Sequence, residues 1–318
     1  LRQAGRAIGG VVGRPDRRRG RGRQLVASAV KQEALNLNLP VFTPERIKKD
    51  SDCQAQLAAL KADASVVVAF GQILPLEVLE QPPLGCWNGH GSLLPRWRGA
   101  APIQWSILDG DAETGVGVMA MEEGLDTGPV LLERRLSIGL QDNAHALAEK
   151  LSGLTAELMV EAMPLIEAVG AGPTDERLHR LGVQHQAEAS CYARMLCKQD
   201  YQIDWSNSAL AIHRQVMGLY PGAQTSWNGK RLKLTQTEPL IDRLKDQLSP
   251  EAQELVGQWP TGGHAGGTVL ACMQHLGLVV TSSGCPLLLR AAQLEGKSRS
   301  RGQALVQQMA AAEQQFIG

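Results

Sequence analysis

Residues 85–121 read GCWNGHGSLLPRWRGAAPIQWSILDGDAETGVGVMAM, and this stretch decides the fold. It begins with a short apolar strand candidate at 85–88 and ends with another at 116–121. Between them, residues 99–110 place apolar side chains at helical spacing. A strand, a helix and a strand in this order predict an α/β domain with a doubly wound, mostly parallel sheet.

The flanking sequence extends this pattern in both directions. Residues 66–70, Val-Val-Val-Ala-Phe, predict a strand buried on both faces. Apolar residues three or four apart over 147–169 predict one long helix, capped by Asp142-Asn143. Pro164 should kink or split that helix, because proline lacks the backbone N–H that the helix needs.

A second domain follows a polar segment with little pattern at 175–190, which we interpret as a linker. Asn228-Gly229 lies between two short strand candidates and predicts a β-hairpin. Short strands at regular spacing are typical of a small barrel. Residues 236–266, rich in Gln, Pro and Gly, predict a long exposed loop. The other elements expected here are a helix at 206–219 and strands at 268–272, 276–281 and 287–291.

Composition excludes several classes of protein. The chain has 318 residues, of which 43% are hydrophobic and 20% charged, so it is not a disordered protein. No apolar run is long enough to span a membrane, and no signal peptide is visible. Six cysteines without a C-x-x-C pair indicate reduced thiols in a cytoplasmic protein.

Charge is distributed unevenly along a chain whose 32 basic and 32 acidic residues balance. Residues 1–50 carry 12 basic and 4 acidic side chains, whereas residues 51–175 carry 6 and 17. This asymmetry permits a polyanionic partner without proving one.

The most specific candidates for chemistry are Asn88 and His90. Residues two apart in a strand point to the same face, and ligands bind at the ends of parallel strands in such sheets. Glycines on both sides of His90 would let a ligand approach the backbone. Asp126, within Gly124–Gly128, follows the strand at 116–121 and should reach the same rim, beside His90.

These three residue types suit acyl transfer to an amine. Asn88 could stabilise the negative oxygen of a tetrahedral intermediate, and His90, oriented by Asp126, could carry a proton. No Ser or Cys nucleophile is required. The alternative is that Asn-x-His is coincidental and that Asp126 only caps a turn. The histidines show no metal-ligand spacing, so we predict no metal site.

The segment 88–104, with 110–115 and Gly124-Leu125-Asp126-Thr127-Gly128, resembles the methionyl-tRNA formyltransferase family. Stretches over essentially the whole chain share the resemblance, among them 69–75, 204–206, 228–232 and 293–297. It implies a formyltransferase-type catalytic domain at 1–174, the linker at 175–190, and an OB-like tRNA-binding domain at 191–318.

The resemblance also implies the substrates and their sites. The formyl donor would be 10-formyltetrahydrofolate and the acceptor the α-amino group of methionyl-initiator tRNA, with no metal. Asn88, His90 and Asp126 fall on the family's catalytic trio. The resemblance places folate contacts on Ser92, Leu93, Leu94 and Pro95, and the pterin pocket on Phe70, Gly71, Gln72, Ile73 and Leu74.

The start of the chain departs from the family, whose members normally open with a strand, a Gly-Thr-Pro loop and a helix. Here Leu1–Gly5 reads as the end of that helix, and residues 7–12 as the next strand. The absent strand would be central, so its loss should prevent stable folding of the first domain. We therefore expect the true start to lie upstream, in a truncated record.

A basic segment at 14–23 carries six arginines, and its Gly and Pro residues predict a loop. The resemblance places this loop at the tRNA acceptor region. For Arg96 and Arg98 the sequence leaves three roles open: a folate tail, tRNA, or local packing. The predicted tRNA contacts are Arg17, Arg18, Arg19, Arg21, Arg23, Lys230 and Arg231.

Three functions remain open from the residues. Transfer to tRNA is favoured by the basic loop and the barrel. A sister formyltransferase could act on an amino sugar or nucleotide precursor, or a hydrolase could release formate. A non-catalytic RNA-binding relative is disfavoured by the intact trio. We expect a cytoplasmic monomer that does not bind membranes.

Overall fold

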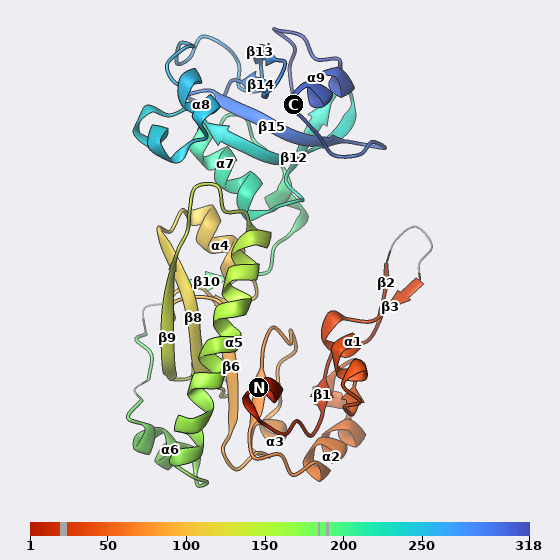
Figure 1. The fold of residues 1–318 in the computed structure, drawn as a ribbon, viewed down its shortest axis with the longest axis vertical. Helices are drawn as coiled ribbons and strands as arrows, with labels where there is room; N and C mark the ends of the chain where they lie inside the picture. The colour runs from red at the N-terminus through yellow and green to blue at the C-terminus, as the bar shows by residue number, and fades with distance from the viewer. Residues whose placement is uncertain (20–23, 184, 189–190) are drawn as a thin grey trace. The chain divides into compact units, whose positions relative to one another are not determined.

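A computed structural model describes residues 1–19, 24–183, 185–188 and 191–318 (Figure 1). Contacts between Cα atoms divide the chain into two compact units. The first unit comprises residues 1–100, 115–135 and 151–192, and the second comprises 101–114, 136–150 and 193–318. The predicted boundaries at 174 and 190 remain a prediction.

The first unit is an α/β structure with two separate sheets that contain parallel pairs. β1 pairs with β4 in parallel, and a four-stranded sheet has the order β5-β6-β8-β9. In that sheet β5 runs parallel to β6, whereas β8 runs antiparallel to β6. The strands are β1 (Val11–Val12), β2 (Arg17–Arg19), β3 (Gln24–Val26), β4 (Val41–Phe42), β5 (Ser65–Val67), β6 (Cys86–His90), β7 (Arg98–Gly99), β8 (Glu113–Ala120) and β9 (Val130–Ser137).

The helices that accompany these strands are short, except for α5. They are η1 (Arg2–Ala4), α1 (Ala29–Asn36), η2 (Ile47–Lys49), α2 (Ser51–Ala59), α3 (Leu76–Leu79), α4 (Pro102–Asp109), α5 (Ala144–Ala168) and α6 (Thr174–Leu181). Of these, α4 and the part of α5 before residue 151 fall in the second unit. The expected helix end at the start of the chain is a 3-10 turn closed by Gly5, whose φ of 79° is left-handed. The strand expected at 7–12 is confined to β1.

The strand predicted at 66–70 is shorter and more open than expected. β5 ends at Val67, its residues are half-buried, and Val68 is 53% exposed. Among the described residues β5 pairs only with β6, so it is an edge strand of its sheet. The prediction of burial on both faces is therefore wrong, because β-branched residues also occur in strands that have one open side.

The long helix is confirmed, but Pro164 does not split it. α5 is continuous, and the Asn143 side chain caps it by accepting the backbone N–H groups of His145 (3.0 Å) and Ala146 (2.9 Å). Buried side chains such as Leu158 and Ile166 lie on both sides of Pro164. Their packing stabilises the helix despite the hydrogen bond that proline cannot make.

The segment interpreted as an unpatterned linker begins with α6. Arg177 of this helix is buried and donates to the carbonyl oxygens of Leu84 (2.7 Å) and Gly172 (3.0 Å). Leu178 is buried beside it in sequence. The polar composition did not predict this helix, because the hydrogen bonds of Arg177, and not a stripe of apolar side chains, fix it to the rest of the first unit.

The second unit contains an antiparallel sheet with the order β11-β12-β15-β14-β13, to which β16 adds by pairing with β15. Bulges in β12 near Gln236 bend the sheet, as is common in small barrels. Its elements are β10 (Tyr192–Ala193), η3 (Lys198–Tyr201), α7 (Ala209–Gly218), β11 (Gln224–Trp227), β12 (Lys230–Pro239), η4 (Asp242–Gln247), α8 (Pro250–Leu255), β13 (Val269–Met273), β14 (Gly277–Val280), β15 (Leu287–Leu294), β16 (Ser300–Arg301) and α9 (Gly302–Met309).

The predicted hairpin is confirmed. Asn228 (φ 47°) and Gly229 (φ 73°) both take positive φ and join β11 to β12 in a tight turn. Positive φ at both positions matches the twist of the flanking strands, which is why Asn-Gly is favoured there.

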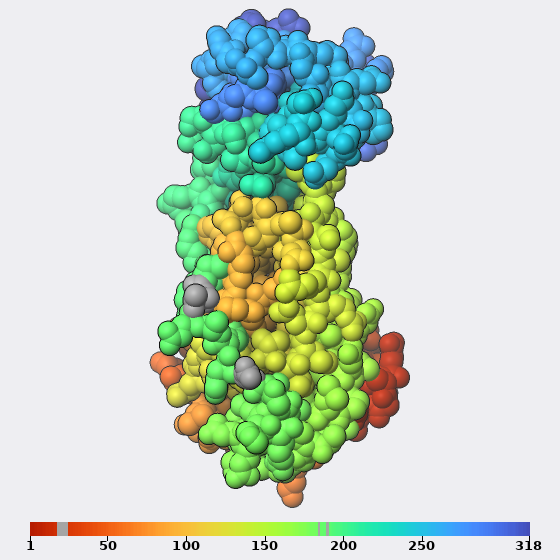
Figure 2. Space-filling view, turned by 90° about the vertical axis from the view of Figure 1, so that its left-hand side faces the viewer, coloured from red at the N-terminus to blue at the C-terminus, as the bar shows by residue number. Residues whose placement is uncertain are grey.

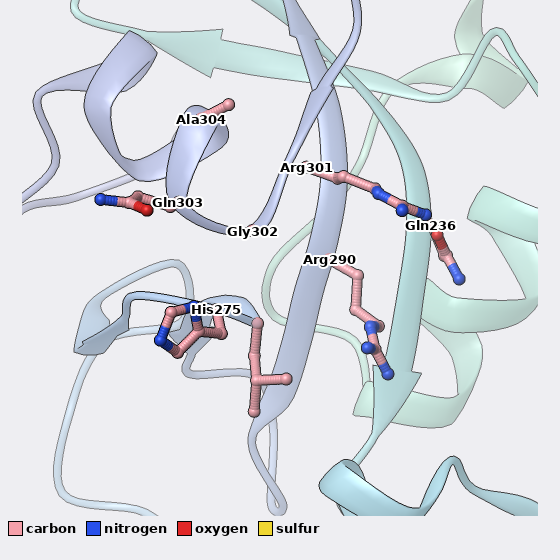
Figure 3. A pocket seen from close by; sticks show the side chains of 8 residues that line it. Gln236, His275, Arg290, Arg301, Gly302, Gln303 and Ala304 are labelled. Atoms are coloured by element: carbon pink, nitrogen blue, oxygen red, sulfur yellow. The ribbon is translucent and has the colours of Figure 1, made fainter.

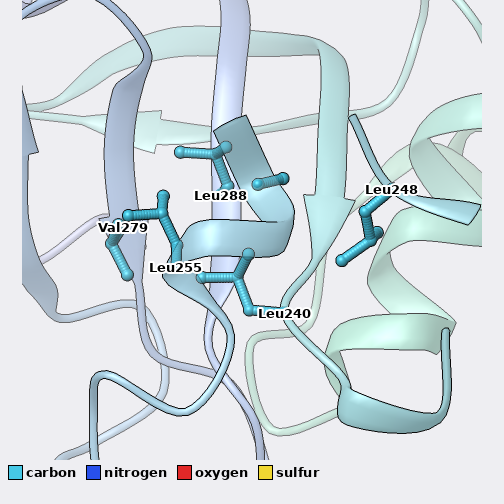
Figure 4. Close-up of a cluster of buried hydrophobic side chains, with 6 residues drawn as sticks. Leu240, Leu248, Leu255, Val279 and Leu288 are labelled. Atoms are coloured by element: carbon cyan, nitrogen blue, oxygen red, sulfur yellow. The ribbon is translucent and has the colours of Figure 1, made fainter. Parts of the chain in front are cut away.

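The prediction of a long exposed loop at 236–266 is wrong for residues 236–255, whereas residues 257–265 contain no helix or strand and are mostly exposed. This segment contains the end of β12, η4 and α8. Figure 4 shows that Leu240, Leu248 and Leu255 from this segment pack with Val279 and Leu288 of the sheet. The few leucines of a polar segment thus fill one side of the core of the second unit, which local composition does not reveal.

Candidate functional site

Asn88 and His90 lie on β6, which is buried along its whole length. Asn88 is 9% and His90 is 5% exposed. Gly89, between them, faces the other way: a Cβ built on it would lie 2.5 Å from Thr155 Cγ2 of α5. Gly89 therefore serves close packing of the helix on the sheet, and the expectation that it admits a ligand is wrong.

Asp126 reaches this strand by a different route from the one predicted. Because β8 runs antiparallel to β6, its end does not lie at the expected rim. The chain instead folds back after β8, and the Ala120 N–H donates to the Pro129 carbonyl (2.9 Å). A Cβ on Gly128 would lie 1.9 Å from the Ala120 oxygen, so only glycine fits this return.

The structure brings the three predicted residues together. His90 Nδ1 lies 3.6 Å from Asp126 Oδ2, and Asn88 Nδ2 donates to Asp126 Oδ1 over 3.5 Å. On the far side of the ring, His90 Nε2 lies 2.9 Å from the Trp97 carbonyl oxygen. The backbone N–H of Gly99 donates to Asp126 Oδ2 over 2.9 Å. One carboxylate thus contacts an amide, an imidazole and a backbone N–H.

This arrangement can stabilise negative charge and move a proton. Both ring nitrogens of His90 face oxygen atoms, those of the Asp126 carboxylate and the Trp97 carbonyl. Asn88 supplies amide N–H groups beside it. Cys86, on the same face of β6, is not a nucleophile, because burial raises the pKa of its thiol to about 11.

The predicted folate stretch Ser92–Pro95 follows directly on β6. The Ser92 hydroxyl donates to the Arg96 carbonyl over 2.6 Å, and both Ser92 and Leu94 are buried. Leu93 and Pro95 are half-buried, and the Leu94–Pro95 peptide is cis. The Ser92 side chain thus stabilises the turn and is not free to bind a ligand. Backbone groups of this stretch remain for such a contact.

Several side chains of the predicted pterin stretch Phe70–Leu74 make contacts within the protein. Gln72 accepts the Ile47 N–H over 2.8 Å and donates to the Pro44 carbonyl over 3.1 Å. Phe70 and Leu74 pack in the cluster around Ile47, whereas Ile73 is 73% exposed. Gly71 takes a φ of 71°. Ile73 and the backbone are the groups that a ligand can reach here.

The basic segment differs from the predicted loop, because it contains β2, which pairs antiparallel with β3 directly after the segment. Arg17 is exposed on β2, and Arg18 and Arg19 follow it in that strand. Arg21 and Arg23 lie outside the described residues. Lys230 and Arg231 are exposed at the start of β12 in the second unit.

Sequence reasoning missed the residues that surround the trio. It left open the role of Arg98, which is buried and donates from Nε (3.0 Å) and Nη2 (2.8 Å) to Gln186 Oε1. Gln186 was taken as part of an unpatterned linker. Figure 2 shows this green stretch of chain lying across an orange and yellow part of the surface. Arg96 lies over the Trp97 ring, 4.4 Å from its centroid. The signal that the sequence offered was an arginine close to Asn88 and His90 in the chain, whereas Gln186 carried no signal of its own.

A hollow of about 340 Å³ lies in the second unit, between β15, β16 and the start of α9 (Figure 3). His275, Arg290 and Arg301 line it. Arg290 is held by the buried Glu238 (2.6 Å) and by the Ser249 hydroxyl (2.6 Å), so much of its charge is already neutralised. The hollow is basic in character and contains none of the predicted reacting residues.

Two general properties bear on the site. Across the described ranges, no three His, Cys, Asp or Glu side chains form a group that could hold a metal ion. Within the same residues, no helix combines the length and apolar character that crossing a membrane requires.

Comparisons with known proteins agree along the chain. Residues 2–163 match the formyl transferase family and residues 195–310 match the formyl transferase C-terminal domain. A protein of Parasynechococcus marenigrum (strain WH8102) named methionyl-tRNA formyltransferase is 96% identical, over 100% of this chain and 94% of its own. A protein of the same name from Synechococcus sp. (strain CC9605) is 71% identical, over 98% and 92%.

A solved structure shares the fold. The crystal structure of HypX from Aquifex aeolicus in complex with tetrahydrofolic acid matches with a TM-score of 0.58. It is 16% identical and covers 90% of this chain and 47% of its own. The domain matches and the identity over the full length show that this chain belongs to the methionyl-tRNA formyltransferase family.

Proposed function

We propose that this enzyme transfers the formyl group of 10-formyltetrahydrofolate to the α-amino group of methionyl-initiator tRNA. The products are formylmethionyl-tRNA, which serves translation initiation, and tetrahydrofolate. The observation that carries the proposal is the contact of Asp126 with both His90 and Asn88. Membership of the family supports the acceptor, and the tetrahydrofolic acid in the related HypX structure supports a folate donor.

The reaction begins when the amine nitrogen attacks the formyl carbon and the carbonyl oxygen becomes negative. We assign Asn88 to this oxygen, because its buried amide can donate to it. Such a donor acts most strongly where charge develops in the transition state. The C–N bond to the folate then breaks, and the oxygen re-forms the carbonyl of the new formamide.

The transfer moves one proton from the attacking amine to the leaving folate nitrogen. We assign this proton to His90, because imidazole is the side chain most often used as general acid or base in catalysis. Asp126 would orient the ring through Nδ1 and stabilise it when it carries a positive charge. No covalent enzyme intermediate is needed.

Folate contacts are proposed for the loop 92–95 and for the segment 70–74. The side chains of Ser92 and Gln72 already make hydrogen bonds within the protein. Backbone groups of the loop 92–95 and the exposed Ile73 therefore fit a flat, polar ring system better. We propose phosphate contacts for Arg17, Arg18, Arg19, Arg21, Arg23, Lys230 and Arg231. We also propose that the enzyme acts as a monomer in the cytoplasm.

The test uses the purified chain with labelled 10-formyltetrahydrofolate. Methionyl-initiator tRNA, methionyl-elongator tRNA and an amino-sugar nucleotide are offered separately as acceptors. We expect label on methionine of the initiator tRNA alone. Label on the sugar nucleotide, or release of free formate without any acceptor, would replace this function by one of the alternatives.

A further inference from the structure

Gln186 touches both segments that contact the reacting pair. Its Nε2 donates to the carbonyl oxygens of Asp126 (3.1 Å) and Gly128 (2.6 Å). Its Oε1 accepts from Arg98 Nε (3.0 Å) and Nη2 (2.8 Å). Gln186 thus uses both ends of its amide on residues next to the site.

Chemistry fixes the orientation of this amide. An arginine side chain can only donate, so the oxygen end must face Arg98. Backbone carbonyls can only accept, so the nitrogen end must face Asp126 and Gly128. An amide satisfies both partners, whereas a carboxylate offers no donor and an ammonium group no acceptor.

The Arg98 side of this contact leads to His90. Arg98 lies between Trp97, whose carbonyl oxygen contacts His90 Nε2, and Gly99, whose N–H contacts the Asp126 carboxylate. Arg98 also donates from Nη2 to the Ala187 carbonyl over 3.5 Å. Residues 97–99 therefore contact both members of the reacting pair and are tied to residues 186–187.

The hydrogen bonds of Gln186 also support the backbone at Asp126. Asp126 takes a left-handed φ of 54°, which a residue other than glycine adopts at a cost unless its surroundings hold it. The two hydrogen bonds from Gln186 fall on the carbonyl of Asp126 itself and on that of Gly128. They hold the backbone on which the carboxylate is mounted.

We propose that Gln186 is a positioning residue that ties the loop of Asp126 to residues 97–99 and so fixes the distance between Asp126 and His90. This inference rests on the proposed function for its kinetic consequence. Gln186 makes no contact with the reacting atoms in this role. It acts through Asp126 and through Arg98.

The kinetic test compares Gln186→Ala and Gln186→Glu with Glu188→Ala, a change at an exposed neighbour in the same segment. Gln186→Glu keeps the acceptor for Arg98 but removes both donors to the loop. Misplacement of a reacting group by about 1 Å can lower a rate about 100-fold. We expect kcat to fall about 10- to 100-fold in both Gln186 variants, with KM for folate and tRNA within about threefold.

A second measurement does not depend on catalysis. The imidazole NMR signals of His90 are assigned by their loss in His90→Asn, and are then compared among the variants. We expect them to move in both Gln186 variants and to stay in place in Glu188→Ala. A shift with no formyl transfer by the unmodified enzyme would overturn the proposed function alone.

Three results would overturn the positioning role. One is unchanged kcat in Gln186→Ala with the His90 signals in place. Another is a rise in KM with kcat unchanged, which would make Gln186 a substrate contact. The third is an equal fall in kcat for Glu188→Ala, which would mean that the segment tolerates no change at all.

Discussion

Two buried histidines of this enzyme differ in what their rings face. His90 on β6 is 5% exposed, and His213 on α7 is 1% exposed. His90 lies between a carboxylate and a carbonyl oxygen. His213 lies between the hydroxyl of Thr237 (Nδ1–Oγ1 3.0 Å) and the carbonyl oxygen of Leu140 (Nε2–O 2.8 Å).

The partners, and not the burial, separate the two roles. Burial lowers the pKa of His213, which keeps its ring neutral, and a hydroxyl can donate to the neutral ring. A carboxylate cannot donate, so the ring nitrogen of His90 that faces Asp126 has to be the donor. A buried histidine therefore indicates proton transfer only when a carboxylate faces it and a substrate can reach it.

The largest effect that follows is on His90. We expect His90→Ala to lower kcat for formyl transfer about 10²- to 10⁴-fold, the usual contribution of a general acid or base. His213→Ala should retain kcat per folded molecule, because that ring touches only the structure of the second unit. Single-turnover formylation of initiator tRNA measures both. Equal losses of kcat in the two variants would show that the two histidines do not differ in their catalytic role.

The next effect is on Asn88, the amide beside His90. We expect Asn88→Ala to lower kcat about 10²- to 10³-fold through loss of one donor to the developing oxyanion. Asn88→Asp, which removes the donor and adds a like charge beside Asp126, should lower it at least as far. Retention of activity in Asn88→Ala would assign the oxyanion to another group, such as a backbone N–H.

The sequence located the trio but not its supports. Asn88 and His90 were found because alternate residues in a strand share a face, and Asp126 because glycines bracket it. The route of Asp126 was misjudged, since spacing does not reveal that β8 is antiparallel to β6. Gln186 was missed because its contacts with residues 98, 126 and 128 exist only after folding.

The fold shows the same division between local and tertiary signals. The hairpin at Asn228-Gly229 and the cap at Asn143 were predictable, because each depends on a few adjacent residues. The short strand β5 and the core leucines at 240–255 were not. Their burial is decided by elements distant in the sequence, which local composition does not report.

A third prediction concerns stability. We expect His213→Ala to lower the free energy of unfolding by about 3 kcal/mol, from a cavity and an unsatisfied Leu140 carbonyl. His213→Gln can still donate to Leu140 and accept from Thr237, and should recover much of this loss. Urea unfolding monitored by tryptophan fluorescence measures both. If Gln restores nothing, shape and not hydrogen bonding makes His213 important.

The smallest effect is on the pH dependence of stability. Because burial lowers the pKa of His213 below its ordinary 6.5, the unfolded chain binds a proton in a range where the folded chain does not. Glu238 opposes this shift and Arg214 reinforces it. Well above pH 6.5 neither state binds the proton and this contribution is flat. Below pH 6.5 the free energy of unfolding should fall as pH falls, by at most about 1.4 kcal/mol per pH unit for this one group.

His213→Gln isolates that contribution, since it keeps the hydrogen bonds and removes the titration. Urea unfolding of the two proteins between pH 5 and 7 should give a steeper slope for the unmodified enzyme. The carboxylates Asp204 and Glu251, whose pKa values are lowered by hydrogen bonds, are present in both proteins, so their contributions cancel in the comparison. Parallel slopes would mean that His213 takes up a proton when folded as readily as when unfolded. The contrast between the two buried histidines would then rest on their hydrogen-bond partners alone.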